Sequence, residues 1–144
     1  MKMLTLLFIL AGIIGCNNDT SISEQDELLG TWELTKFENQ TSTITITDLD
    51  NSGSIVITFN EDNFEGNTGR NTFFGDYTEE EEVLMLTEYN STEINESEWG
   101  QKFTNAIVST YSTTDNYYHI LYTIYGTSLK IEYEPNRFMF FKKL

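Results

Sequence analysis

The sequence predicts a mainly β (α+β) fold, in which an antiparallel, cracked β-barrel or strongly curved sheet carries one packed helix near residues 95–110. Aromatic residues make up 14% of the chain, and such side chains pack well on pleated surfaces. Apolar and polar residues alternate over several short runs, which is typical of half-buried antiparallel strands. We therefore expect about seven to nine strands.

The expected strands are separated by residues that favour turns. Alternation is found in residues 31–35, 43–47, 54–59, 118–124 and 128–133. Turn-forming residues lie at 48–53, 60–63, 126–127 and 135–136. The final run, 137–143, is apolar on both faces, with Phe138 and Phe140 on one and Met139 and Phe141 on the other. This pattern predicts a last strand that is covered on both sides, with a helix as one candidate cover.

One segment has helical spacing instead. Trp99, Phe103, Ala106 and Ile107 recur at the intervals of one helix face. Asn95 is followed three residues later by Glu98, an arrangement that resembles a capping box. We therefore predict an amphipathic helix that begins near Asn95 and buries its aromatic residues against the sheet.

The charge of the chain restricts the kind of partner it can have. The chain has 144 residues, of which 23 are acidic and 8 basic, so its net charge is −15. One folded domain is the natural expectation at this length. Nucleic acid is excluded as a partner, because phosphates repel such a protein. An acidic exterior favours a soluble monomer and a basic protein partner.

The N-terminus reads as a targeting segment. Residues 1–15, MKMLTLLFILAGIIG, contain an apolar run from Met3 to Ile14. A transmembrane helix needs about 20 apolar residues, so this run suits a signal peptide better. It ends in Ile13-Ile14-Gly15-Cys16, which resembles the lipobox of bacterial lipoproteins. The resemblance implies cleavage before Cys16, the attachment of acyl chains such as palmitate to Cys16, and anchoring in the outer membrane of a Gram-negative bacterium. The alternative is a free cysteine after an ordinary secretory signal.

The segment after the cysteine is polar. Residues 16–27 show no periodicity and predict a flexible acidic tether. The folded domain is then expected over residues 28–144. Two or more acyl chains anchor a protein stably, so the mature domain is expected to sit on the membrane without spanning it.

A glycine-rich segment indicates a family. Residues 66–77 read GNTGRNTFFGDY, and their spacing resembles the signature of the META domain, the family of HslJ-like lipoproteins. The residues that match are Gly66, Gly69, Asn71, Phe73, Gly75 and Tyr77. The resemblance extends over nearly all of residues 28–144 and includes the opening Gly30-Thr31-Trp32. Physically, we expect the glycines to provide positive φ or close backbone approach.

The resemblance implies a cracked barrel whose gap a helix fills, and a non-catalytic role in the envelope and its stress response through an unidentified protein partner. Many members of the family have a cysteine where Arg70 stands here. A disulfide or redox role tied to that position therefore does not transfer to this chain. A solvated Arg70 is expected instead.

Few residues support enzyme or metal chemistry. Residues 48–53 match the first half of a calcium-binding loop, but Phe59 stands where the bidentate Glu is required, so a hairpin turn is the simpler reading. His119 is the only histidine. It is expected on an exposed face of its strand, away from any motif. We therefore expect no catalytic residue, no metal and no cofactor.

The alternative function is a lipocalin-like carrier of a small apolar ligand. Gly30-Thr31-Trp32 also matches the lipocalin opening, and Arg137 could stack on Trp32 as a basic residue near the lipocalin C-terminus does. The glycine cluster at 66–77 favours the META domain over this reading. A barrel filled by Trp99, Phe103 and Ile107 would also leave no cavity for a ligand.

Overall fold

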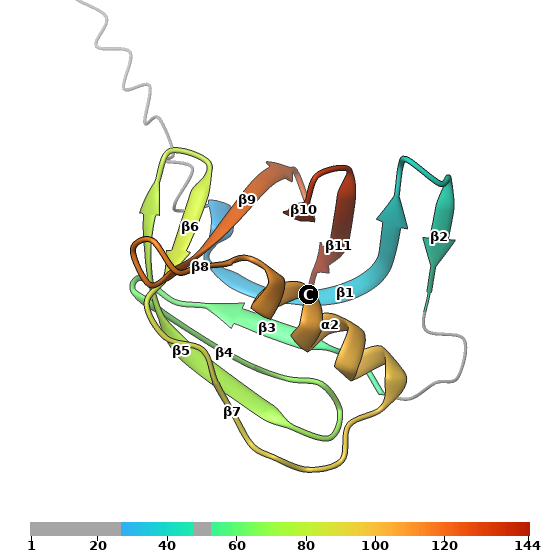
Figure 1. Cartoon of the computed structure of the whole chain (residues 1–144), viewed down its shortest axis with the longest axis horizontal. Coiled ribbons are helices and arrows are strands. Elements are labelled where there is room, and N and C mark those ends of the chain that lie inside the picture. Colours follow the sequence, from blue (N-terminus) through green and yellow to red (C-terminus); the bar gives the residue numbers. More distant parts are fainter. Residues whose placement is uncertain (1–26, 48–52) are drawn as a thin grey trace, which may run out of the picture.

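Eight antiparallel strands form a closed ring in the computed structural model, which describes residues 27–47 and 53–144 (Figure 1). The barrel strands are β1 (Gly30–Asn39), β3 (Val56–Phe59), β4 (Asn63–Asn67), β5 (Thr72–Glu80), β6 (Val83–Leu86), β9 (Tyr117–Tyr125), β10 (Ser128–Glu134) and β11 (Arg137–Lys143). They follow the order β10-β11-β1-β3-β4-β5-β6-β9, and β9 pairs with β10 to close the ring. The predicted antiparallel barrel is therefore confirmed.

Three short strands add to the barrel outside this ring. Strand β2 (Ile44–Ile46) pairs with β1, β7 (Asn90–Ser91) with β5, and β8 (Tyr111–Ser112) with β9. The predicted turns at 60–63, 126–127 and 135–136 lie between strands, and Gly126 and Asn136 adopt positive φ there. The predicted turn or calcium loop at 48–53 lies outside the described residues, apart from Gly53.

A bulge in β1 reconciles two apolar patterns within one strand. Trp32 and Leu34 have even residue numbers and Phe37 has an odd one, yet all three side chains are buried. The pairing of β1 with β11 shifts register between Leu34 and Lys36, so one extra residue restores the inward direction at Phe37. Strand β1 bends strongly (Figure 1) and pairs with β3 in its first half and with β2 in its last residues.

Strand β11 is apolar on both faces, as predicted, but its outer face is covered by lysines and not by a helix. Met139 and Phe141 face the core, whereas Phe138 and Phe140 point outward. The ammonium of Lys130 lies 5.0 Å from the centre of the Phe138 ring, and that of Lys36 lies 4.3 Å from the centre of Phe140. The lysine stems shield these rings while their charges stay in water.

The single predicted helix is confirmed as α2 (Glu98–Ser109), and it buries Trp99, Phe103, Ala106 and Ile107. Its start differs from the prediction. The N-cap is Ser97, whose hydroxyl accepts a hydrogen bond from the Gly100 amide at 3.0 Å, so the capping box from Asn95 to Glu98 was wrong. The chain before Ser97 is irregular and is hydrogen-bonded to Asn71, as described below.

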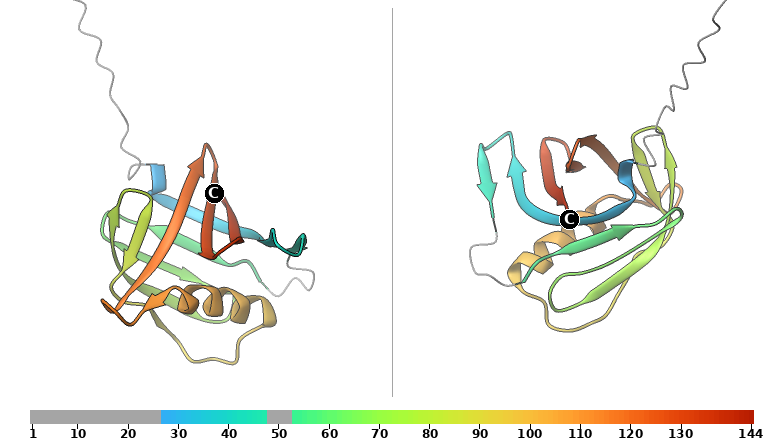
Figure 2. Two further views of the ribbon diagram at one scale, coloured as in Figure 1. Left: turned by 45° about the horizontal axis from the view of Figure 1, so that its top comes forward. Right: turned by 180° about the vertical axis from the view of Figure 1, so that it is seen from behind.

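Helix α2 packs across one end of the barrel, as the two further views show (Figure 2). The Trp99 ring meets Phe37 edge-on with 5.0 Å between ring centres, and Phe103 lies 5.1 Å from Phe73. These contacts hold the helix against β1 and β5. No helix among the described residues is long and apolar enough to cross a bilayer.

Candidate functional site

The glycine-rich segment forms the end of β4, a turn and most of β5. Gly66 is the register partner of Phe73, and Gly75 is the register partner of Phe64. A Cβ atom at Gly66 would collide with the Val56 carbonyl and the Phe73 ring, and one at Gly75 would collide with the Glu88 carbonyl. The expected close approach of backbones is thus found at both positions.

Gly69 has the other expected role. It lies in the turn between β4 and β5 with φ of +87°. Residues with a Cβ rarely adopt this conformation. The turn closes through hydrogen bonds of Thr68 and Asn71, in which the Thr68 amide donates to the Asn71 carbonyl at 2.9 Å and the Asn71 amide donates to the Thr68 hydroxyl at 3.0 Å.

Asn71 joins this turn to the irregular segment before α2. Its side-chain nitrogen Nδ2 donates to the Ile94 carbonyl at 2.8 Å and to Oε2 of Glu96 at 2.7 Å. Its side-chain oxygen Oδ1 accepts from the Ile94 backbone amide at 2.8 Å and from the Thr92 hydroxyl at 2.9 Å. Asn71 is buried, so these four bonds satisfy an amide that would otherwise be costly to bury.

Glu96 is the charged member of this cluster. It also accepts a hydrogen bond from the Thr68 hydroxyl and one from the Ser97 amide at 2.8 Å. Burial alone would raise the pKa of Glu96, but hydrogen bonds from Asn71, Thr68 and Ser97 together outweigh burial and hold that pKa below its ordinary value. We call Thr68, Asn71, Thr92, Glu96 and Ser97 the Asn71 cluster.

Sequence reasoning missed Thr68, Thr92 and Glu96. No local pattern marks them, because Asn71 and Glu96 are 25 residues apart and meet only in the folded chain. Gly100 belongs to the same arrangement, since a Cβ there would collide with the Glu96 side chain.

Tyr77 lies at the other end of β5. Its hydroxyl donates to the Asn60 carbonyl, and its ring meets Phe59 edge-on with 5.6 Å between ring centres. Burial, helped by the carboxylates of Glu79 and Asp62, raises the pKa of Tyr77 to about 12. The hydrogen bond from its hydroxyl ties β5 to the β3–β4 turn. The six motif residues thus hold strands, turns and the helix start in place.

Arg70 is exposed and donates to the Asn95 carbonyl at 3.1 Å. His119 pairs with Asp115 at 2.8 Å and keeps 38% of its side chain exposed, in agreement with the prediction. Among residues 27–47 and 53–144, no group of three or more His, Cys, Asp or Glu side chains is placed to hold a metal ion. Cys16 and the predicted signal and tether segments lie outside the described residues.

Trp32 is covered by a different cation from the one predicted. The ammonium of Lys143 lies 5.0 Å from the centre of the Trp32 ring, and the two residues are register partners of β1 and β11. Arg137 lies at the opposite end of β11, in register with Asn39, and pairs with Glu134 at 2.9 Å. The prediction that Arg137 stacks on Trp32 was therefore wrong, because another basic residue, Lys143, occupies that place.

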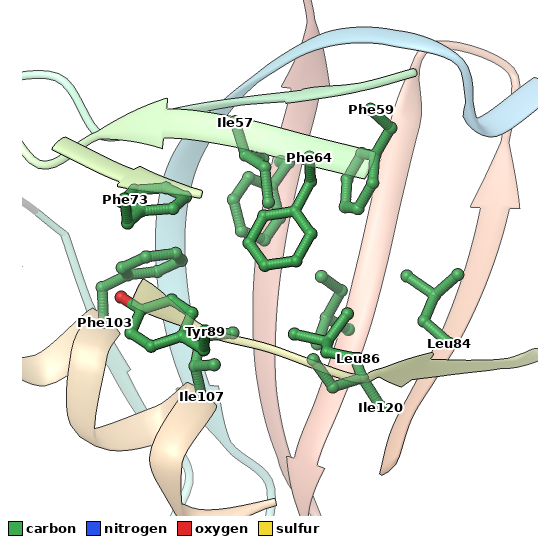
Figure 3. A pocket seen from close by; sticks show the side chains of 12 residues that line it. Ile57, Phe59, Phe64, Phe73, Leu84, Leu86, Tyr89, Phe103, Ile107 and Ile120 are labelled. Carbon is green, nitrogen blue, oxygen red and sulfur yellow. The ribbon is translucent and has the colours of Figure 1, made fainter. Parts of the chain in front are cut away.

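The barrel interior is almost filled (Figure 3). The space inside it is about 10 Å³, whereas small-molecule sites usually have about 300–1,000 Å³. The rings of Phe73 and Phe103 face each other from the sheet and the helix, and Tyr89 lies beside them. The side chains around the space are Ile57, Phe59, Phe64, Phe73, Leu84, Leu86, Tyr89, Phe103, Ile107, Ile120, Ile131 and Phe141.

Comparison with known proteins places the chain in a family. The model of the META domain matches residues 25–142. The chain matches none of the curated proteins.

Solved structures share the fold. A protein from Burkholderia xenovorans is 13% identical, covers 83% of this chain and 86% of its own length, and superposes with a TM-score of 0.61. A lipocalin-like protein from Bacteroides uniformis is 17% identical, with coverage of 82% and 99% and a TM-score of 0.55. A DUF4847 family protein from Bacteroides vulgatus is 13% identical, with coverage of 80% and 92% and a TM-score of 0.57.

Proposed function

The chain belongs to the META domain family, and on this basis we propose that it is a non-catalytic lipoprotein of the bacterial envelope. In this proposal, acyl chains on Cys16 hold a monomeric barrel at the outer membrane, and the barrel acts by contact with another protein as part of the response to envelope stress. The residues of the glycine-rich motif and the Asn71 cluster then stabilise the fold of the barrel that contacts the partner.

The observation that carries the proposal is the filled barrel. An interior of about 10 Å³ has room for about one water molecule. Residues on the outside of the barrel and at its ends are therefore left as the means of recognition. The closely packed rings of Phe73, Phe103 and Tyr89 make an internal cavity costly to open, because separating them exposes apolar surface.

Charge supports a lipid anchor over adsorption to headgroups. Leu28 and Trp32 lie at the end of the barrel that also contains the turns at Asn60–Asn63 and Glu80–Val83, since Gly30 pairs with Phe59 and Tyr77 contacts Asn60. These two turns and the adjoining end of β5 contain Glu61 and Asp62 and the run from Glu79 to Glu82. Anionic lipids repel such a surface, so acyl chains on Cys16 would have to provide the binding energy.

One observation favours the second candidate function, a lipocalin-like carrier. Gly30-Thr31-Trp32 opens the barrel and Lys143 covers Trp32, which reproduces the arrangement that suggested this reading. The filled interior argues against it. A carrier would need at least about 300 Å³ inside the barrel, so Phe103 and Tyr89 would have to move apart.

The experiment compares the full chain with Cys16→Ser, using Thr20→Ser as a matched control in the same segment. We expect wild-type and Thr20→Ser chains in the outer-membrane fraction, with an acylated N-terminal peptide that begins at Cys16 in mass spectrometry. The Cys16→Ser chain should lack acyl mass and leave the membrane fraction. An unacylated wild-type peptide would refute the anchor.

The same preparations test the two functions against each other. Native mass spectrometry with a fatty acid such as palmitic acid should show no specific complex of the purified protein, whereas a carrier would bind one molecule per chain.

A strain that lacks the protein should grow worse under envelope stress. Wild type should restore growth, and Cys16→Ser should not. Normal growth of the deletion strain under every such stress would count against the stress role.

A further inference from the structure

Two surface hollows at one end of the barrel join into a single trough. Their volumes are about 410 and 200 Å³, and they share Lys102, Tyr133 and Arg137. Their lining residues come from helix α2, from the β1–β2 hairpin and from the turn between β10 and β11. The β1–β2 hairpin projects beyond the ring of strands (Figures 1 and 2). We call it the α2–β2 trough and define it by Phe37, Ile44, Ile46, Lys102, Tyr133 and Arg137.

Its apolar wall continues the inner face of the barrel. Ile46 is the register partner of Phe37, and Ile44 is the register partner of Asn39. Phe37 is covered by Trp99 in the core, but the hairpin extends past the helix, so Ile44 and Ile46 remain 52% and 39% exposed. Two neighbouring isoleucines on one face form an apolar patch that water solvates poorly.

Strand β2 also offers a backbone edge. Within the described part of the chain, β2 pairs with β1 alone. Among residues 27–47 and 53–144, nothing pairs with its other edge, where backbone N–H and C=O groups lie beside the two isoleucines. Such an edge can accept a further strand, and the side chains of that strand then decide specificity.

The opposite wall carries two cations, Lys102 and Arg137, and the carboxylates of Glu38, Glu98 and Glu134 also line the two hollows. Lys102 projects from α2 with its ammonium 5.0 Å from the centre of the Phe37 ring. Within residues 27–47 and 53–144, no carboxylate lies within ion-pair distance of it, although the chain has 23 acidic residues and only 8 basic ones. Arg137 pairs with Glu134 and stays 47% exposed. A cation held over apolar surface with no counter-ion is suited to accept a carboxylate from a partner.

The trough lies at the opposite end of the barrel from Leu28. Arg137 and Asn39 form one end of the β1–β11 ladder, and Lys143 and Trp32 form the other. Leu28, whose carbonyl accepts from the Trp32 indole at 2.8 Å, marks the end from which the N-terminal segment continues. The described chain thus begins at the end of the barrel opposite the trough, so a tether through Cys16 would be attached far from it.

We propose that the α2–β2 trough binds an extended segment of a partner protein that presents apolar side chains and a carboxylate on one face. The segment adds to the outer edge of β2, its apolar residues cover Ile44 and Ile46, and its Asp or Glu pairs with Lys102. This proposal rests on the proposed function, because it names the docking surface of a protein that works by contact. It does not depend on the lipid, so a failed anchor test would leave it intact.

The test uses the purified mature chain in detergent and a display library of random heptapeptides. We expect the selected peptides to have apolar residues at every second position. One Asp or Glu should stand at another of these alternate positions, so that it lies on the same face of the strand. The most enriched peptide is then made with its acidic residue replaced by the amide or by Lys, and binding is measured by fluorescence anisotropy. We expect about tenfold weaker binding for the amide and still weaker binding for Lys.

Matched variants locate the site. Lys102→Glu should weaken binding of the acidic peptide by about tenfold or more, whereas Lys130→Glu, which makes the same change of charge on the outer face of β10, should leave it within about twofold. Ile44→Ser with Ile46→Ser should also weaken binding, while circular dichroism confirms that the barrel remains folded.

Several outcomes would overturn the proposal. With a net charge of −15, general electrostatics would favour basic peptides, so selection of basic sequences would show that the trough does not act as described. Equal effects of Lys102→Glu and Lys130→Glu, or no enriched peptide, would refute it as well.

Discussion

The ring of Phe73 lies against the backbone of Gly66, its register partner on the neighbouring strand. The same hairpin contains the reciprocal pair, in which Phe64 faces Gly75. Each aromatic ring occupies the space that a Cβ atom on the opposite glycine would need. The glycines therefore allow β4 and β5 to bring two large rings into a core that leaves almost no empty volume.

Replacement of Gly75 by Ala should destabilise the protein by about 3 kcal/mol, because the added methyl group would overlap the Glu88 carbonyl and force backbone to move. Gly126→Ala is the matched control, since nothing lies within 4 Å of a Cβ at that turn, and its cost should be about 1 kcal/mol from positive φ alone. Urea unfolding of the two variants measures both values. Equal midpoints would contradict the steric role of Gly75.

Gly69→Val should lower the stability by more than Gly69→Asn. The position has φ of +87°, which a β-branched residue tolerates poorly and asparagine tolerates better. We expect a difference of about 1–2 kcal/mol between the two variants. Thermal unfolding followed by circular dichroism checks the order, and a melt of Gly69→Val that equals wild type would disprove it.

Acid should remove part of the stability through Glu96. Its pKa is lowered in the folded protein, so its contribution is complete above the pKa of the unfolded chain and is lost as pH falls through the folded value. The stability difference between wild type and Glu96→Gln should therefore be largest near pH 7 and shrink below about pH 4.3. Glu98→Gln, an exposed neighbour, serves as the control. A difference that does not vary with pH would refute the role of the charge.

Lys143→Met should change the environment of Trp32, whereas Arg137→Met should not. The Lys143 ammonium lies over the indole and also donates to the Glu27 carbonyl at 3.0 Å. Its loss should cost about 0.5–1 kcal/mol and shift tryptophan fluorescence. The measurement is best made in a Trp99→Phe background, in which Trp32 is the only tryptophan. A shift caused by Arg137→Met alone would contradict the register of β11.

Much of the fold was predictable because its signals are local. Alternation at 118–124 and 128–133 predicted β9 and β10, since neighbouring residues of a strand point to opposite faces whatever the strand pairs with. The spacing of Trp99, Phe103 and Ile107 predicted α2 for the same reason. The motif at 66–77 predicted glycines that are needed for positive φ and close approach, and both roles are found.

Other features depended on contacts between distant parts of the chain. Helix α2 starts after Ser97 because Ile94 and Glu96 form hydrogen bonds with Asn71, more than 20 residues earlier in the chain. The outer face of β11 is covered by Lys36 and Lys130 because β1 and β10 flank it. Pairing partners of this kind leave no periodic trace in the sequence.

The sequence by itself determined the strands, the helix, the glycine turns and the family, because each depends on residues that are close together in the chain. The tertiary structure alone decided that Lys143 and not Arg137 covers Trp32, since the register between β1 and β11 sets which cation faces the indole. It also decided that Ile44, Ile46 and Lys102 share one trough, because only the projection of the β1–β2 hairpin past α2 brings an uncovered apolar edge opposite an unpaired cation.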